Sequence, residues 1–189
     1  VATLSGCQPS STDNLSLPAP VAERMPAGVH PTGYKVDLTI NPTQERFNGV
    51  VEIALVFDKP TKEMWLHGQD LAVSEAQLTT ADGRKLTAAY APAEDHEGWA
   101  RVSFAEAVQS GAATLRIAYD APFGQQGAAL YRFKSGEAYY VASQMEPLDA
   151  RRVIPSFDEL RFKVPFKVSV TAPASDKAFF NTREVGAET

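Results

Sequence analysis

The stretch YKVDLTINPTQERFNGVVEIALVF, residues 34–57, decides the fold. In residues 34–40 apolar side chains alternate with polar ones, which is the period-2 pattern of a half-buried strand. The dipeptide Asn41-Pro42 interrupts this pattern. Residues 46–57 place apolar side chains on both faces of a second strand, and the turn residues at 58–60 end it. We therefore expect two successive strands, the second of them central in a sheet and covered on both sides.

Shorter segments of strand-like composition follow at 63–67, 72–79, 85–90, 99–104, 114–119, 129–133, 139–144 and 166–172. The clearest hairpin turn is Ala81-Asp82-Gly83-Arg84, since Asp-Gly accepts the positive φ of a primed turn. Only residues 106–110 and 149–153 could be helical, and Pro155 would end the second of these. Ten short strands with almost no 3.6-residue periodicity predict an all-β fold, either a β-sandwich or a curved multi-sheet domain.

The N-terminal residues 1–23 differ in composition from the rest of the chain. Residues 8–23, QPSSTDNLSLPAPVAE, are rich in Ser, Thr and Pro, and their few apolar side chains follow no period. Such a segment buries too little apolar surface to offset its ordering entropy. We therefore expect a flexible linker up to residue 23 and a β-rich domain over residues 24–189.

Just before this linker, Leu4-Ser5-Gly6-Cys7 resembles the lipobox of bacterial lipoproteins, where a signal peptidase cuts before the cysteine and the cysteine is acylated. Residues 1–3 would then be the remnant of a signal peptide. The resemblance implies lipidation of Cys7, membrane attachment through it, and a place in the bacterial cell envelope as a periplasmic or surface lipoprotein. The alternative is an ordinary tail of small residues with an exposed thiol.

Overall charge and cysteine content exclude several classes of protein. The chain has 18 Lys and Arg against 23 Asp and Glu, a net charge of −5, and no basic stripe, so we expect no nucleic-acid partner. No apolar run approaches the roughly 18 residues of a transmembrane helix. The single cysteine can form neither an intramolecular disulfide nor a thiolate zinc site alone.

Charged residues are dense between 143 and 159, in SQMEPLDARR and, two residues further on, IPSFDE. Large apolar residues lie between them, which indicates that the charges are partly desolvated and need partners. One interpretation is that these charges pair with one another and fix the course of the loop (Asp149, Arg151, Arg152, Asp158 and Glu159). The other is that one carboxylate, Glu146 in the first place, is left unpaired to bind a cationic group.

The runs QMEP at 144–147, DARR at 149–152 and FDE at 157–159, together with Pro155, resemble the signature of one family. This family is the zinc aminopeptidases of the aminopeptidase N type, and the signature lies in their N-terminal domain. Further similarities, at Pro31, 34–38, 47–51, 115–119 and Tyr131, extend the resemblance over residues 28–172. It implies a saddle-shaped, all-β N-terminal domain that packs on a thermolysin-like catalytic domain of the same protein.

The resemblance also implies roles for individual residues. The glutamate at the position of Glu146 projects into the active site and helps to bind the free α-amino group of a peptide substrate. Gln144, two residues earlier, points to the same side of an extended strand and would line the same pocket. The remaining signature residues carry over as scaffold or interface residues: Asp149, Arg151, Arg152, Asp158 and Glu159. Leu160 departs from the family, which commonly has proline there.

The family's zinc-binding motif and its exopeptidase motif, which supplies a second amine-binding glutamate, are both absent from the chain. Neither H-E-x-x-H nor G-x-M-E-N occurs, and His30, His67 and His96 include no i,i+4 pair. We expect these histidines at the surface or at strand ends, and zinc bound only in the full-length enzyme. Residues 181–189 look like the connection to one more strand, so we expect a fragment that is inactive alone and contains no catalytic residue.

Two functions from different classes follow. The first is the substrate-binding and scaffold domain of a zinc metallo-aminopeptidase that removes N-terminal residues from peptides. The second is a self-standing, non-catalytic β-sandwich module that binds other proteins. The first predicts an exposed apolar seam near Glu146 where the catalytic domain would dock, whereas the second predicts that the chain's own strands seal this region.

Overall fold

A computed structural model describes residues 15, 17–20, 24–125 and 127–187. These residues form ten strands and one 3₁₀ helix, η1, and the all-β prediction is confirmed. Within them, no helix has the length and apolar character needed to cross a membrane. The elements are β1 Val29–Thr39, β2 Arg46–Phe57, β3 Thr61–His67, β4 Ala72–Thr80, β5 Lys85–Pro92, β6 Trp99–Val108, β7 Gly111–Pro122, β8 Ala129–Ser135, β9 Ala138–Gln144, η1 Asp149–Arg152 and β10 Phe166–Thr171.

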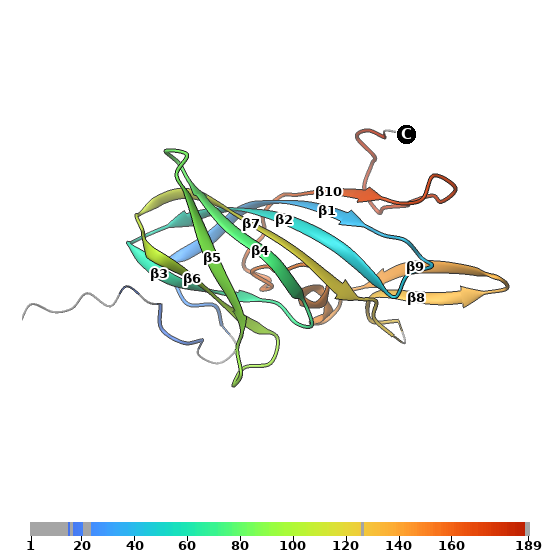
Figure 1. Ribbon diagram of the computed structural model, residues 1–189, viewed down its shortest axis with the longest axis horizontal. Coiled ribbons are helices and arrows are strands. Elements are labelled where there is room, and N and C mark those ends of the chain that lie inside the picture. Colours follow the sequence, from blue (N-terminus) through green and yellow to red (C-terminus); the bar gives the residue numbers. More distant parts are fainter. Residues whose placement is uncertain (1–14, 16, 21–23, 126, 188–189) are drawn as a thin grey trace, which may run out of the picture.

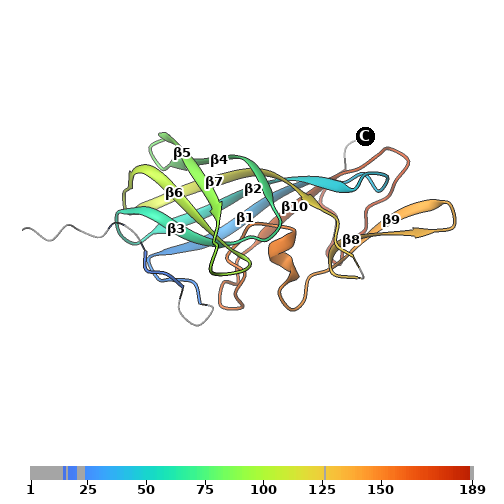
Figure 2. The same ribbon diagram turned by 60° about the horizontal axis from the view of Figure 1, so that its bottom comes forward.

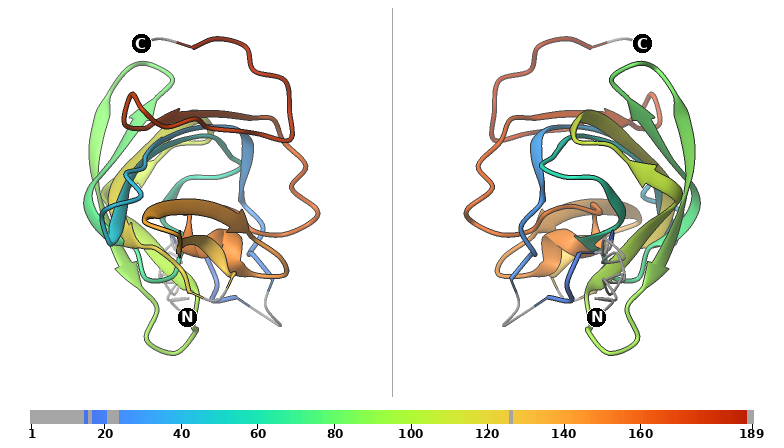
Figure 3. Two further views of the ribbon diagram at one scale, coloured as in Figure 1. Left: turned by 90° about the vertical axis from the view of Figure 1, so that its right-hand side faces the viewer. Right: turned by 90° about the vertical axis from the view of Figure 1, so that its left-hand side faces the viewer.

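Eight of the strands form one sheet in the order β10-β1-β2-β7-β4-β5-β6-β3, while β8 and β9 pair separately as a hairpin. β10 runs parallel to β1, and the other neighbours in the large sheet are antiparallel. The hairpin extends beyond one end of the sheet (Figure 1). Seen end-on, the sheet curls into an open arc with η1 on its concave side (Figure 3).

The core lies on the concave face, and β2 shows how the sequence builds it. β2 is central, between β1 and β7, as predicted. Val51, Ile53, Leu55 and Phe57 are at most 1% exposed, and full burial of such a side chain stabilises the fold by roughly 1.5–3 kcal/mol. The opposite face of β2 is only half-buried, so the prediction that both faces are covered is wrong. This face is the outer surface of the curled sheet.

The hairpin turn predicted at 81–84 connects β4 to β5. Gly83 has φ +85, which a residue without a side chain adopts freely. Thr80 closes the turn, because its N–H donates to the Arg84 carbonyl over 2.9 Å and its carbonyl accepts from the Gly83 N–H over the same distance. The Asp-Gly signal therefore predicted the hairpin correctly, but the turn is not a primed one, because neither of its central residues, Ala81 and Asp82, has a positive φ.

The helical turn predicted at 106–110 is wrong, because β6 continues to Val108. Val108 pairs with Thr61 of β3 and is 1% exposed, so burial in the core favours the extended chain here. Glu106 pairs with Arg84 over 2.9 Å. Neither pairing could be inferred from local composition.

Part of the predicted flexible linker packs on the domain. Leu17 is 6% exposed and belongs to the core cluster. The Leu15 carbonyl accepts a hydrogen bond from the N–H of Lys62 in β3, over 2.6 Å. The linker prediction is therefore wrong for this stretch, since one well-placed leucine and one strand edge are enough to fix it. Cys7 lies outside the described residues.

Candidate functional site

The candidate site begins where the β8–β9 hairpin ends (Figure 2). Gln144 is the last residue of β9 and pairs with Ala129, and Glu146 lies in the turn that follows. The prediction that both side chains share one extended strand is therefore wrong. Instead, the Gln144 side-chain oxygen accepts a hydrogen bond from the Glu146 N–H at 3.5 Å, and a cis peptide bond joins Glu146 to Pro147.

The Glu146 side chain is exposed to solvent. Within the part of the chain that the structure describes, its carboxylate has neither an ion pair nor a hydrogen bond. The turn that carries it is closed by the Asp149 N–H, which donates to the Met145 carbonyl over 3.0 Å. An unpaired carboxylate on a closed turn can accept hydrogen bonds from a cation.

Behind this turn, Arg151 is a buried cation with a partner. Its side chain is 8% exposed, and its Nε lies 3.2 Å from a carboxylate oxygen of Asp158, which is 21% exposed. Its carbonyl accepts a hydrogen bond from the Gln69 N–H over 2.9 Å. The pair satisfies both charges at low exposure, where an unpaired charge would be costly.

The other predicted scaffold residues also have partners. Arg152 pairs with Asp70 over 2.9 Å and with Asp149 over 3.8 Å. Glu159 accepts a hydrogen bond from the Met25 N–H and pairs with Arg161 over 2.6 Å. The charges of residues 149–159 thus have partners within this segment and next to it. Through these ion pairs and hydrogen bonds the segment is attached to the β3–β4 turn and to the residues before β1. Their role as scaffold residues stays a prediction.

His67 belongs to this region, although the sequence analysis expected of it only a place at the surface or at a strand end. It ends β3, as expected, but it is 1% exposed and forms an antiparallel bridge with Ser156. Its Nδ1 accepts a hydrogen bond from the Asp158 N–H over 3.0 Å, and its ring lies 4.0 Å from that of Trp99. Burial, and secondarily the Arg151 guanidinium, lower the pKa of His67 to about 3. The ring is therefore neutral at physiological pH.

Two tyrosine hydroxyls hold the same segment from the large sheet. The Tyr34 hydroxyl accepts a hydrogen bond from the Phe157 N–H over 2.9 Å. The Tyr119 hydroxyl donates to the Val153 carbonyl over 2.6 Å. Burial raises the pKa of both hydroxyls well above the ordinary value, so both stay protonated. The alternation of β1 and β7 predicts that these rings point inward, but not which backbone groups they meet.

Exposed apolar side chains lie on the hairpin and beside the Glu146 turn. The rings of Phe133 and Tyr140 stack with centroids 5.6 Å apart, although each is more than two-fifths exposed. Leu148, two residues after Glu146, is 57% exposed. Leu148 is thus an exposed apolar side chain next to Glu146, whereas Phe133 and Tyr140 lie toward the tip of the hairpin. A continuous apolar seam at Glu146 stays a prediction.

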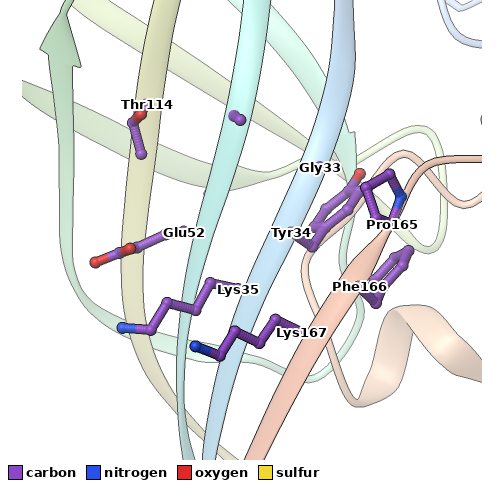
Figure 4. A pocket seen from close by; sticks show the side chains of 9 residues that line it. Gly33, Tyr34, Lys35, Glu52, Thr114, Pro165, Phe166 and Lys167 are labelled. Atoms are coloured by element: carbon purple, nitrogen blue, oxygen red, sulfur yellow. The ribbon is translucent and has the colours of Figure 1, made fainter. Parts of the chain in front are cut away.

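A shallow hollow of about 400 Å³ crosses β10, β1, β2 and β7, away from Glu146. Figure 4 shows the side chains of Lys35, Lys167 and Glu52 at one end and the rings of Tyr34 and Phe166 at the other. Lys35 is directly opposite both Lys167 and Glu52 in the strand registers. Neither Gln144 nor Glu146 lines this hollow, so it is separate from the candidate site.

The residues that the structure describes do not fit a zinc ion, because no three His, Cys, Asp or Glu side chains among them are grouped so as to hold a metal. His30 lies beside Asp58 at 3.6 Å, and His96 lies beside Asp95 at 3.0 Å. His67 is buried among other partners, as described above. The three histidines therefore have separate surroundings.

Comparison with known sequences places this arrangement of strands and signature residues in a family. The profile of the family described as "Peptidase M1 N-terminal domain" matches residues 30–189. The chain belongs to this family. The match includes all ten strands except the first residue of β1, and it includes the whole Glu146 region of this M1 N-terminal domain.

Curated relatives of this M1 N-terminal domain carry aminopeptidase names. The chain is 26% identical over 164 residues to "Aminopeptidase A" of Gloydius brevicauda, covering 84% of the chain and 17% of the relative. It is 29% identical over 165 residues to "Aminopeptidase N" of Acetobacter pasteurianus, covering 85% of the chain and 45% of the relative. It is 30% identical over 181 residues to "Aminopeptidase 2, mitochondrial" of Saccharomyces cerevisiae, covering 89% of the chain and 18% of the relative. The chain thus spans less than half the length of each of these relatives.

Proposed function

We propose that this M1 N-terminal domain is the substrate-binding and scaffold domain of a zinc metallo-aminopeptidase that removes N-terminal residues from peptides. The observation that carries the proposal is the exposed carboxylate of Glu146 on a closed turn, which has no ion pair or hydrogen bond with any residue that the structure describes. Gln144, beside it, would line the same pocket. The aminopeptidase names of the relatives support the reaction class.

The chemistry of the proposed role is recognition of an ammonium group. The α-amino group of a peptide is cationic at or below its pKa of about 8, and a carboxylate attracts it by about 4 kcal/mol at 4 Å where the effective dielectric constant is near 20. Because Glu146 is fixed relative to the domain, binding the amine there would fix the distance from the chain terminus to the scissile bond. An enzyme built this way removes one residue at a time.

The proposed partner is a thermolysin-like catalytic domain of the same protein. It would supply zinc, the general base and the second amine-binding glutamate, since the residues described here do not fit a metal. The exposed side chains of Phe133 and Tyr140 on the hairpin, and of Leu148 beside Glu146, support a docking partner for this region, whereas a self-standing module would be expected to seal it. Docking would also cover a two-stranded hairpin, which is marginal in stability alone.

The decisive experiment uses the intact enzyme and Glu146→Gln, which keeps the shape of the side chain and removes its charge. We expect KM for leucine p-nitroanilide to rise about 10- to 100-fold, since a hydrogen bond to a charged group contributes roughly 1.5–3 kcal/mol. Glu137→Gln is the matched control, because Glu137 is 98% exposed in the turn of the same hairpin. Equal KM values for the Glu146→Gln variant and the parent enzyme would refute the proposed role.

The isolated chain of 189 residues is proposed to be inactive. Two results together would contradict this: hydrolytic activity on the same substrate that stays with the chain through a second column, and loss of that activity in Glu146→Gln.

We also propose that Cys7 carries a lipid that anchors the protein in the bacterial cell envelope, on the basis of the lipobox-like residues 4–7. Mass spectrometry of protein extracted from membranes tests this directly. A diacylglyceryl mass on a peptide that begins at Cys7, absent after Cys7→Ser, is the expected result. An unmodified thiol in that fraction would refute it.

A further inference from the structure

The turn between β3 and β4 contains a residue in an uncommon backbone conformation. Asp70 has φ +59, in the left-handed region that few residues other than glycine adopt, although Asp and Asn adopt it more readily than most. Its carboxylate lies 2.9 Å from a guanidinium nitrogen of Arg152 in η1. The conformation of this turn thus brings an anion to the helix that follows Glu146.

From Asp70 a continuous set of contacts leads to the Glu146 turn. Arg152 also lies 3.8 Å from the carboxylate of Asp149. The N–H of Asp149 donates to the Met145 carbonyl over 3.0 Å and so closes the turn that contains Glu146. Next to Asp70, the Gln69 N–H donates to the Arg151 carbonyl over 2.9 Å. The β3–β4 turn therefore holds η1 through both a side chain and the backbone.

These contacts help to fix the Glu146 carboxylate, because most of the turn is open to solvent, although Met145, directly before Glu146, packs against the core. Glu146, Pro147 and Leu148 are all exposed, so core packing does not fix them. On one side the turn is attached to β9, and on the other side it continues into η1. A shift of η1 would move the carboxylate relative to the rest of the domain.

We propose that Asp70 is a positioning residue for Glu146 and acts through Arg152 and Asp149. The proposal rests on the proposed function in that Glu146 binds the substrate amine. Asp70 touches no substrate. Loss of its charge loosens η1 and the turn, and weakens the recognition of the amine without altering the reacting groups.

The first test needs only this chain. Hydrogen exchange of residues 145–150 is measured by mass spectrometry in Asp70→Asn, which tolerates positive φ but lacks the charge. We expect exchange there to accelerate about two- to fivefold, the range that an exposed ion pair supports, with an unchanged unfolding midpoint. Asp120→Asn is the matched control, since Asp120 forms an ion pair of similar exposure with Arg46 in the large sheet. Unchanged exchange at 145–150 in Asp70→Asn would overturn the proposal.

A double variant tests the route. Arg152→Gln is expected to accelerate exchange at 145–150 as Asp70→Asn does, and the double variant is expected to be no faster than Arg152→Gln alone. Additive effects of the two substitutions would show that Asp70 does not act through Arg152, and would overturn the proposal.

The second test uses the intact enzyme and two inhibitors, leucine hydroxamate and its desamino analogue, 4-methylpentanohydroxamate. Asp70→Asn is expected to weaken the binding of leucine hydroxamate about two- to fivefold and to leave the binding of the desamino analogue unchanged. For substrate turnover, it is expected to raise KM rather than lower kcat. If Glu146→Gln still distinguishes the two inhibitors as the parent enzyme does, the proposed function is refuted. Whether Asp70 positions the Glu146 turn is then decided by the hydrogen-exchange experiment. If Glu146→Gln no longer distinguishes the two inhibitors but Asp70→Asn distinguishes them as the parent does, only the positioning role of Asp70 is overturned.

Discussion

The Nδ1 atom of His67 accepts a hydrogen bond from the backbone N–H of Asp158, 3.0 Å away, and can do so only while Nδ1 carries no proton. Because the pKa of His67 is about 3 in the folded chain and about 6.5 when unfolded, the unfolded state binds the extra proton first as the pH falls. This contribution to stability is complete above pH 6.5 and is lost progressively as the pH falls toward 3.

Urea unfolding between pH 7 and pH 4 measures this contribution. In His67→Asn, whose side-chain oxygen can still accept the Asp158 N–H, the free energy of unfolding should fall less steeply over this range than in the parent chain. His30→Asn is the control, because His30 is 43% exposed. Identical pH slopes for His67→Asn and the parent would show that His67 titrates normally.

Substitution of Arg151, the buried cation of the charged segment 143–159, should destabilise the domain. Arg151→Ala leaves the Asp158 carboxylate, which is 21% exposed, without its partner. We expect a loss of roughly 2–3 kcal/mol in the free energy of unfolding, below the range for a fully buried pair. Arg84→Ala breaks the exposed pair with Glu106 and should cost less than about 1 kcal/mol. Equal costs for the two variants, measured by urea unfolding, would contradict this account.

Gly49 makes room for an aromatic ring on the neighbouring strand. A Cβ at this position would lie 2.3 Å from Cζ of Tyr119, whose hydroxyl holds the Val153 carbonyl. Gly49→Ala is therefore expected to cost about 1–3 kcal/mol and to accelerate hydrogen exchange near Val153. At Gly33 a Cβ would be 3.6 Å from its nearest neighbour, so Gly33→Ala should change the stability by less than about 0.5 kcal/mol. Comparable unfolding midpoints for the two variants would disprove the packing argument.

The segment before β1 should contribute to the stability of the core. Leu17 is 6% exposed, so Leu17→Ala is expected to cost about 2 kcal/mol, at the low end for a buried leucine because the site is peripheral. Pro18→Ala, at an exposed neighbour, should be nearly neutral. Thermal unfolding followed by circular dichroism distinguishes the two. A Leu17→Ala variant as stable as the parent would restore the flexible-linker interpretation for this stretch.

Local patterns predicted most of the strands, because alternation with period 2 is a property of neighbouring residues. The alternation of 34–40 and 46–57 and the Asp-Gly turn at 82–83 all correspond to observed elements. Where a prediction failed, a distant partner decided the structure. Val108 is extended because it packs in the core and pairs with Thr61, and Leu17 is fixed because the core has a place for it.

The candidate site was predictable to a similar degree. The resemblance pointed to Glu146, and the structure leaves its carboxylate exposed and unpaired among the described residues. Its role in binding an amine stays a prediction. The contacts of His67 and Asp70 with the signature segment were beyond sequence reasoning, because each joins residues some eighty to ninety positions apart through the tertiary fold.

The parallel pairing of β1 with β10 has a consequence for biosynthesis. Tyr34 is aligned with Phe166, and their rings stack 4.3 Å apart, so the first strand gains its second neighbour only after nearly the whole domain has left the ribosome. Until then β1 is the edge strand of the nascent sheet, a state that favours misassociation and slows the final pairing with β10. Ribosome-stalled chains released before residue 166 should therefore be sensitive to protease and bound by chaperones, whereas chains that include β10 should become resistant.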